Sequence, residues 1–181
     1  SGQGQFIDIE PENQFMFIGW FTYTESDSDN PNEQQWYTAQ GKYSGDTAVL
    51  DLHETLGGKF DDPQAVTTEK VGMVTLNFED CSHGTMSYGF NTGDRKGSFP
   101  LVRVISDSEN LCENLRESTI QSIDIYDGMD GAWFNPATSG QGFYFDVYSN
   151  PEDDRYIFVS WFTYGNDTAS GQRWLTAQGD F

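Results

Sequence analysis

Short stretches in which apolar and polar residues alternate recur along most of the chain, and turn-forming residues separate them. Ala48, Leu50 and Leu52, for example, occupy every second position of the stretch 47–54. Successive side chains of a strand point to opposite faces of a sheet, so this alternation is typical of β-structure. The pattern predicts strands over 5–9, 14–24, 35–43, 47–54, 71–78, 84–90, 98–105, 143–148, 156–164 and 172–181.

One segment follows the period of a helix instead. Ser106 is followed three residues later by Glu109, which is the signature of a capping box at a helix start. Leu111 and Leu115 lie four residues apart and would share one face of that helix. The sequence therefore predicts one short helix over 107–117, about three turns long.

Three blocks of sequence occur twice in the chain. They are Ser-Gly-Gln-Gly at 1–4 and 139–142, Trp-Phe-Thr-Tyr at 20–23 and 161–164, and Thr-Ala-Gln-Gly at 38–41 and 176–179. The copies are separated by 138 (139 − 1), 141 (161 − 20) and 138 (176 − 38) residues. Block lengths are constant while the spacing changes, as expected for strands joined by loops that tolerate insertions.

The strand spacing predicts an all-β fold: an antiparallel meander of about eight strands, closed as a barrel or folded as a two-sheet sandwich. Residues 1–105 would supply strands two to eight of one repeat, 106–130 a helical linker, and 131–181 strands one to four of the next repeat. A short first strand near Trp133 would complete the first repeat by circular permutation. Strands two to four of the second repeat are then surplus, and their free edges would seek a neighbour.

Composition narrows the classes of partner. Asp and Glu number 29 against 9 Lys and Arg, a formal charge of −20, which disfavours nucleic acid and anionic membranes. This charge suits simple solubility, an extracellular surface, a salty medium, or the collection of divalent cations. The longest apolar run, 15–23, is too short to cross a membrane. Since the chain opens on Ser1, inside the repeat and without a signal peptide, we expect a processed or trimmed piece of a longer protein.

The two cysteines, Cys81 and Cys112, favour a disulfide and an oxidising compartment over two free thiols. Asp27 and Asp29, in the acidic loop 25–33, are candidate calcium ligands, although the loop lacks the spacing of an EF-hand and a solvated loop is the simpler interpretation. No other metal and no cofactor is predicted.

The sequence has no nucleophile–base grouping and no phosphate-binding loop, because His53 and His83 stand alone in their segments. We therefore predict that the chain is not an enzyme. Asp8 and Asp146 match between the two copies, and each more simply accepts hydrogen bonds from turn amides. A hydrolase built on either aspartate would need a second carboxylate across a cleft.

The run from Gly131 to Phe143, Gly-Ala-Trp-Phe-Asn-Pro-Ala-Thr-Ser-Gly-Gln-Gly-Phe, precedes the second Trp-Phe-Thr-Tyr and Thr-Ala-Gln-Gly blocks. Together these motifs resemble tandem β-repeat modules of secreted proteins from Gram-negative bacteria. That resemblance implies a secreted protein but no activity, since none is assigned to those modules. The Gly-Ala-Trp segment is also similar to the first strand of avidin-like and lipocalin barrels, which implies an eight-stranded barrel and not biotin or lipid binding.

The repeated aromatic residues allow two interpretations. Trp36, Thr38 and Gln40 share one strand face, which either binds sugar rings or packs against another strand layer. Trp20 and Phe21 make the preceding strand apolar on both faces, so that a second sheet or a partner should cover it. The residues predicted to join neighbouring molecules are Trp20, Phe21, Tyr23, Trp36, Trp161, Phe162, Tyr164 and Trp174.

From these features we expect a structural or adhesive protein, extracellular or at the cell surface. It would be the subunit, or one unit, of a repeat-built filament in which β-strands pair between units, so its partners would be copies of itself. The alternative is a carbohydrate-binding module that holds glycans with exposed Trp and Tyr side chains.

Overall fold

The computed structural model describes residues 3–24, 33–60, 65–103, 131–133, 140–149, 155–165 and 171–180. Every regular element within these ranges is a β-strand, which confirms the predicted all-β fold. The strands form two antiparallel sheets, one of seven strands and one of four. The predicted helix over 107–117 and the linker 106–130 lie outside the described residues.

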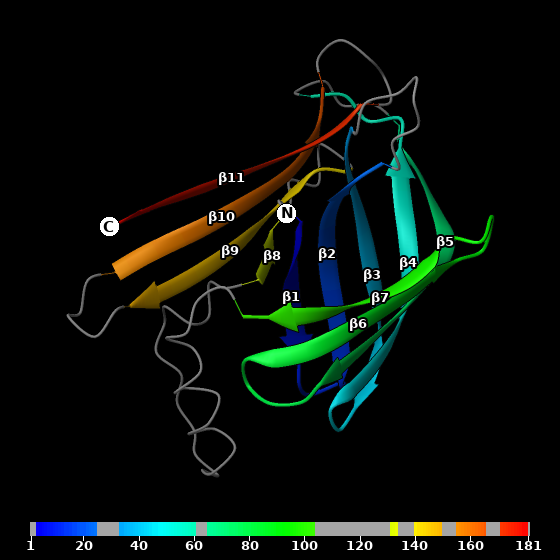
Figure 1. Ribbon diagram of the computed structural model, residues 1–181. Coiled ribbons are helices and arrows are strands. Elements are labelled where there is room, and N and C mark those ends of the chain that lie inside the picture. The colour runs from blue at the N-terminus through cyan, green and yellow to red at the C-terminus, as the bar shows by residue number, and fades with distance from the viewer. Residues whose placement is uncertain are drawn as a thin grey trace.

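The larger sheet is a meander in which each strand pairs with the next along the chain (Figure 1). Its strands are β1 (Gly4–Glu10), β2 (Phe15–Tyr23), β3 (Gln34–Ser44), β4 (Thr47–Leu56), β5 (Thr67–Phe78), β6 (His83–Phe90) and β7 (Lys96–Val102). The tight β3–β4 hairpin has a two-residue loop that starts with Gly45 at φ +60°, a conformation that glycine adopts without strain. The sheet curls strongly, and β1 and β7 are its edges.

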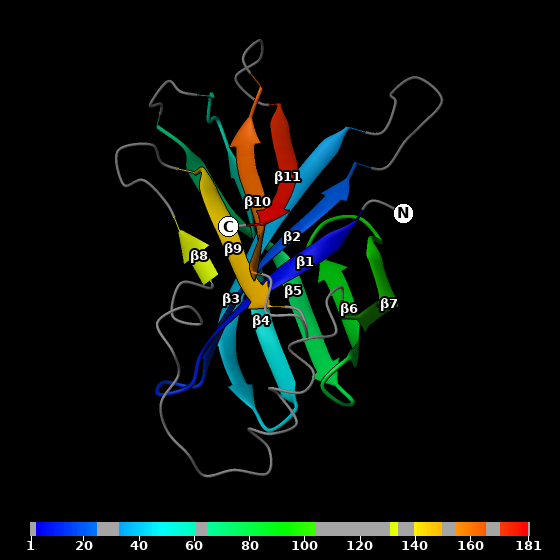
Figure 2. The same cartoon turned by 90° about the vertical axis from the view of Figure 1, so that its left-hand side faces the viewer.

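The smaller sheet has the order β11-β10-β9-β8. Its strands are β8 (Gly131–Trp133), β9 (Gly142–Ser149), β10 (Arg155–Tyr164) and β11 (Gln172–Asp180). Figure 2 shows β9, β10 and β11 in front of β1, β2 and β3, so that the second copy of the repeat lies over the same strands of the first copy.

The predicted circular permutation is not formed. β8 pairs with β9, Trp133 opposite Phe143, and does not pair with β1 or β7. Only about ten residues separate these partners, so the loop-closure entropy is far smaller than for pairing with the first copy. The first strand therefore stays with its own repeat.

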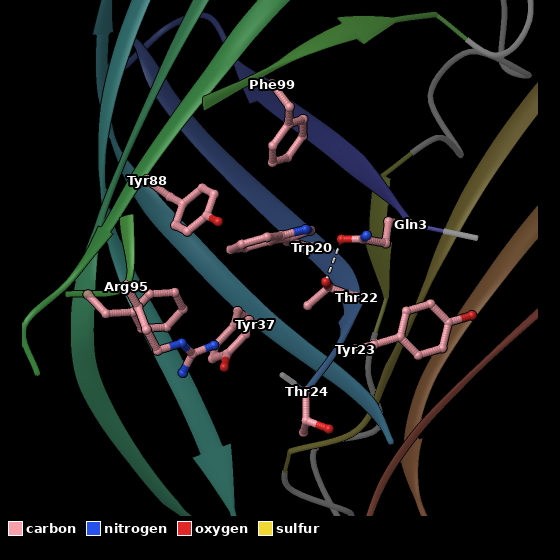
Figure 3. A pocket seen from close by; sticks show the side chains of 10 residues that line it. Gln3, Trp20, Thr22, Tyr23, Thr24, Tyr37, Tyr88, Arg95 and Phe99 are labelled. Atoms are coloured by element: carbon pink, nitrogen blue, oxygen red, sulfur yellow. Dashed lines mark hydrogen bonds between the residues drawn. The ribbon is translucent and has the colours of Figure 1, made fainter. Parts of the chain in front are cut away.

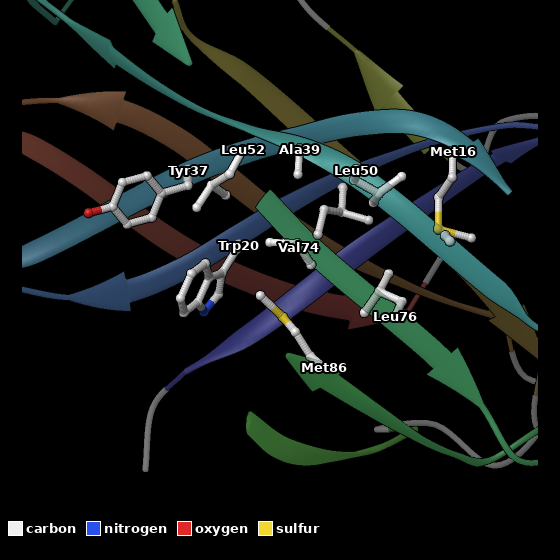
Figure 4. Packing of buried hydrophobic residues seen from close by; sticks show 11 residues of the cluster. Met16, Trp20, Tyr37, Ala39, Leu50, Leu52, Val74, Leu76 and Met86 are labelled. Atoms are coloured by element: carbon white, nitrogen blue, oxygen red, sulfur yellow. The ribbon is translucent and has the colours of Figure 1, made fainter. Parts of the chain in front are cut away.

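The core of the larger sheet follows from the alternation in the sequence. Side chains at every second position of β2 to β6 point into the curl, where they form one cluster (Figure 4). The fully buried aliphatic members are Ile18, Leu50, Leu52, Val74 and Leu76. Burying such side chains contributes about 1.5–3 kcal/mol each relative to exposure, which fixes the register of the meander.

Candidate functional site

The two copies of the repeat pack against each other through equivalent faces. Trp36, Tyr144, Phe162 and Tyr164 form a buried aromatic cluster between the sheets. Phe6, Phe17, Phe21 and Trp174 pack around that cluster. Six of the eight residues predicted to join neighbouring molecules thus meet inside one chain: Phe21, Tyr23, Trp36, Phe162, Tyr164 and Trp174.

The contacts across this interface are reciprocal. Trp36 Nε1 donates to the carbonyl oxygen of Thr163 at 3.2 Å, and Trp174 Nε1 donates to that of Thr22, also at 3.2 Å. Trp36 and Trp174 are the repeated tryptophans, and Thr22 and Thr163 are the repeated threonines. Each copy therefore gives the other the same hydrogen bond.

The ring contacts are reciprocal as well: the indole of each repeat touches the Phe and the Tyr of the Trp-Phe-Thr-Tyr block in the other repeat. The centroid distances are 5.9 Å for Trp36–Phe162, 5.8 Å for Trp36–Tyr164, 5.1 Å for Trp174–Phe21 and 5.7 Å for Trp174–Tyr23. Phe21 and Phe162, which are equivalent residues, face each other at 6.3 Å. The interface thus has approximate two-fold symmetry, the arrangement of an isologous dimer within one chain.

The repeated glutamines also cross the interface, but only one of them is deeply buried. Gln34 donates to the carbonyl oxygen of Trp174 at 3.2 Å. Its equivalent, Gln172, accepts from the Trp36 backbone N–H at 3.0 Å and donates to the Thr55 carbonyl oxygen at 3.1 Å. The β3–β4 ladder ends at the pair Thr38–His53, so the Gln172 amide bridges the two strands where their own pairing stops.

The Ser-Gly-Gln-Gly blocks have one role in both copies. The glutamine of each block, Gln3 or Gln141, accepts a hydrogen bond from the hydroxyl of the repeated threonine, Thr22 or Thr163. Gly140, in the second block, has φ +76°, which favours glycine. These blocks therefore recur because they tie the start of one strand to the next strand.

Two of the predicted interface residues lie elsewhere. Trp20 points into the curl of the larger sheet and is only 5% exposed. Trp161 lies on the opposite face of β10, where its ring is 5.3 Å from Phe60 and 5.4 Å from Phe143. Trp36 is 3% exposed, so the Trp36 face packs against the second sheet and offers no platform for a sugar.

The paired aspartates have different surroundings. Asp8 Oδ2 accepts the backbone N–H of Ala132, in β8, at 3.2 Å. Asp146, the equivalent residue on β9, is half-buried: desolvation raises its pKa, and the guanidinium of Arg103 offsets part of that rise. Arg103 follows β7 and donates through Nε to the carbonyl oxygen of Cys81 at 2.9 Å.

Cys81 is buried and disulfide-bonded. Cys112, the other cysteine of the sequence, lies outside the described residues, and the pairing of the two remains a prediction. The candidate calcium ligands Asp27 and Asp29 lie outside them as well. In the part of the chain that the structure describes, no three His, Cys, Asp or Glu side chains gather as a metal site would require, and no helix has the length and apolarity to span a bilayer.

The second sheet has an apolar face turned away from the interface. Phe143, Phe145 and Trp161 line it, and Leu175 on β11 is 51% exposed. Leu175 takes the place of Tyr37 in the first copy, which is 1% exposed because the rest of the curled sheet covers it. The face that forms a core in the first copy is therefore open to solvent at this position in the second.

A pocket of about 510 Å³ lies at one end of the curled sheet (Figure 3). Its lining includes Trp20, Tyr37, Tyr88 and Phe99 together with Arg95. Burial raises the pKa of the Tyr37 hydroxyl, and a hydrogen bond with Arg95 acts in the opposite direction. Trp20, predicted to join neighbouring molecules, lines this pocket instead, because the pairing of β6 with β7 brings Phe99 on β7 and Arg95 in the β6–β7 connection to the same lining.

Comparison of the chain with known protein families, characterised proteins and solved structures finds no match.

Proposed function

We propose that this chain is a structural unit of an extracellular assembly in which strands of like units complete one another's sheets. The observation that carries the proposal is the apolar face of the second sheet. Among the described residues no strand pairs with the outer edge of β11 and no counterparts of β4 to β7 cover this face, so Leu175 is 51% exposed.

The first repeat indicates what fits this face. There, Tyr37 and Ala39 on β3 are buried because β4, β5 and β6 supply Leu50, Leu52 and their neighbours on the far side of the curl. The matching positions on β11 are Leu175 and Ala177, both exposed. In a like unit β4 to β6 are already paired on both sides, so the strand that it can offer is β7, the edge of its larger sheet. This strand would pair with the outer edge of β11 beside Leu175.

A second, different surface lies at the outer edge of β1. In the second repeat β8 occupies that position on β9, with Gly131 opposite Phe145, and places the Ala132 N–H on Asp8. The two repeats are related by an approximate two-fold axis. A Gly-x-Trp strand paired along β1 would therefore place its central backbone N–H at Asp146, as β8 places the Ala132 N–H at Asp8. Desolvation of Asp146 already raises its pKa, so a donor there would offset that cost.

Contacts between two unlike surfaces give a ring when the rotation between units closes and an open array when it does not, and the open array is the form proposed here. The formal charge of −20 opposes contact between units at low salt and keeps single units soluble. Association should therefore become stronger as salt screens that repulsion. Such salt-dependent association is expected of a secreted structural protein that assembles only where the salt concentration is high enough.

Sedimentation velocity on the purified chain, over a range of concentrations and salt, tests the proposal. We expect association that increases with salt and that Leu175→Asp abolishes, since a charge on the open face would have to be buried in the contact. Val49→Asp is the matched control: Val49 lies on β4 and is 49% exposed, against 51% for Leu175.

A chain that stays monomeric at every concentration and salt would refute the proposal. Equal loss of association in the two variants would also refute it, because the effect would then come from added charge rather than from the open face. Electron microscopy of the associated fraction distinguishes a linear array from a closed oligomer, and only the former agrees with the proposal.

A further inference from the structure

The outer edge of β1 lacks the residues that usually protect a sheet edge. Its sequence, Gly-Gln-Phe-Ile-Asp-Ile-Glu, contains neither proline nor lysine, and among the described strands only β2 pairs with it. Natural sheets commonly place such residues on their edges, because an open edge accepts further strands. The β1 edge is therefore suited to receive one.

The second repeat indicates which strand fits this edge. On β9, Phe143 lies opposite Trp161. On β1, Gln5 lies opposite Trp20 in the same way, and the two tryptophans are repeated residues, so β9 is the counterpart of β1 in register as well as in sequence. The outer edge of β9 is occupied by β8, whose sequence is Gly-Ala-Trp. The equivalent occupant of β1 is a Gly-x-Trp strand that runs antiparallel to it.

The first position of such a strand requires glycine. Gly131 has φ +117°, a conformation that side-chain-bearing residues rarely adopt. A Cβ atom on Gly131 would also lie 2.9 Å from Oδ2 of Asp8. Because Asp146 is the counterpart of Asp8, the first residue of a strand on β1 would meet the Asp146 carboxylate and should be glycine for the same reason.

The second position is recognised through its backbone. The Ala132 N–H donates to Oδ2 of Asp8 at 3.2 Å. The counterpart carboxylate, Asp146, is half-buried and accepts no hydrogen bond from any described residue, and Arg103 is the charge that stabilises it. The N–H of an incoming strand would give this carboxylate the donor that Asp8 already has.

The third position is recognised through its side chain. Trp133 lies opposite Phe143, so the two side chains share one face of their sheet. At the matching level of β1, Gln5 points into the curl together with Trp20. A tryptophan opposite Gln5 would therefore direct its ring into the curl. There the rings of Trp20 and Phe99, 6.2 Å apart, line the pocket of about 510 Å³ (Figure 3).

We propose that the β1 edge is a recognition site for extended Gly-x-Trp segments and that its partner is β8 of a second copy of the chain. Backbone pairing supplies affinity, while the glycine, the N–H and the indole ring supply specificity. β8 is three residues long, and on β1 of a neighbour it would regain the pairing that it leaves on β9. The inference rests on the proposed assembly and deepens it, because it identifies the segment that this edge takes.

The experiment is a titration of the isotope-labelled chain, followed by nuclear magnetic resonance, at low salt where units are expected to stay apart. The ligand is the uncharged peptide acetyl-Gly-Ala-Trp-Phe-Asn-amide, the sequence of residues 131–135. We expect saturable shifts of the backbone amides of Gly4–Glu10. Peptides with Gly131→Ala, with N-methylalanine in place of Ala132, or with Trp133→Ala should each bind at least about fivefold more weakly.

Two variants of the chain locate the site. Asp146→Ala should weaken peptide binding about five- to tenfold, because the acceptor for the central N–H is lost. Asp8→Ala is the matched control: Asp8 is the equivalent residue, but it holds β8 of its own chain, so the affinity should not change. The reverse result would mean that the peptide displaces β8 from β9, and it would overturn the proposal. The three altered peptides need only the wild-type chain, so they decide the matter if a chain variant fails to fold.

Absence of saturable shifts, shifts confined to β9 or β11, or equal affinity for all four peptides would also overturn the proposal. Sedimentation of the same chain at high salt separates this inference from the proposed assembly. A chain that binds the peptide but never associates refutes the assembly, while recognition of Gly-x-Trp stands. A chain that associates but does not bind the peptide refutes the recognition alone.

Discussion

Replacement of Gln172 by Ala tests the energetic role of the amide that bridges β3 and β4. Gln172 is 4% exposed and makes two hydrogen bonds, to the Trp36 N–H and to the Thr55 carbonyl oxygen. The Thr55 oxygen would keep a second donor, the Tyr164 hydroxyl at 3.2 Å, but the Trp36 N–H would be left buried without an acceptor. An orphaned donor costs about 1–3 kcal/mol and one lost bond about 0.5–1.5 kcal/mol, so unfolding should become easier by about 2–4 kcal/mol.

The repeat supplies the matched control, Gln34→Ala. Gln34 is the equivalent residue of the first copy, it is less buried, and it makes a single hydrogen bond, to the Trp174 carbonyl oxygen. Its removal should cost only about 0.5–1.5 kcal/mol. The same chemical change at two equivalent positions thus separates the effect of the orphaned donor from that of truncating a glutamine.

Urea denaturation, followed by tryptophan fluorescence and by far-ultraviolet circular dichroism, measures both variants. Agreement between the two probes establishes that unfolding is two-state and that the free energies can be compared. If the two variants lose equal stability, the bridging role of Gln172 is refuted. A loss below about 0.5 kcal/mol for Gln172→Ala would show that the Trp36 N–H finds another acceptor.

Two further substitutions probe the interface between the sheets. Gly58→Ala should destabilise the fold by about 1–3 kcal/mol in the same urea assay, because the added methyl group would overlap the Tyr164 ring. Gly89→Ala, at a strand position where a methyl group meets nothing within 4 Å, should cost nothing, and an equal loss in both would contradict the packing argument. Asp146→Asn should remove a pH dependence: since the folded-state pKa of Asp146 lies above its ordinary value of 3.8, the wild type loses this contribution to stability as pH rises through the raised pKa. Denaturation at several pH values from 3 to 7 checks this, and a wild type and variant with parallel profiles would contradict it.

The sequence predicts most strands well because one face of each is buried. β4 and β6 are found close to their predicted ranges, and alternation of apolar residues marks both. β5 begins at Thr67, earlier than the predicted start at residue 71. The alternation of apolar residues does not mark residues 67–70, because they are exposed on both faces of the sheet. That part of the strand exists only through its pairing with the end of β4.

The interface between the repeats was harder to predict, because one sequence pattern is compatible with two arrangements. A strand that is apolar on both faces, such as β2, must be covered, but its sequence does not say whether a second molecule or the same chain covers it. Phe21 and Trp36 are covered by the second copy of their own chain. The pocket beside Trp20 has no sequence signal at all, since it depends on the approach of Phe99 on β7 and of Arg95 in the β6–β7 connection.

The reciprocal hydrogen bonds of Trp36 and Trp174 bear on how such a chain arises. A face that fits itself under a two-fold axis already joins two identical molecules, so duplication and fusion of a single-repeat gene would turn a homodimer contact into an internal one. Tethering raises the effective concentration of the two faces to about the millimolar range for a flexible connection, and the contact then survives dilution. Each copy afterwards mutates on its own, and Tyr37 in one copy against Leu175 in the other is the kind of divergence this permits.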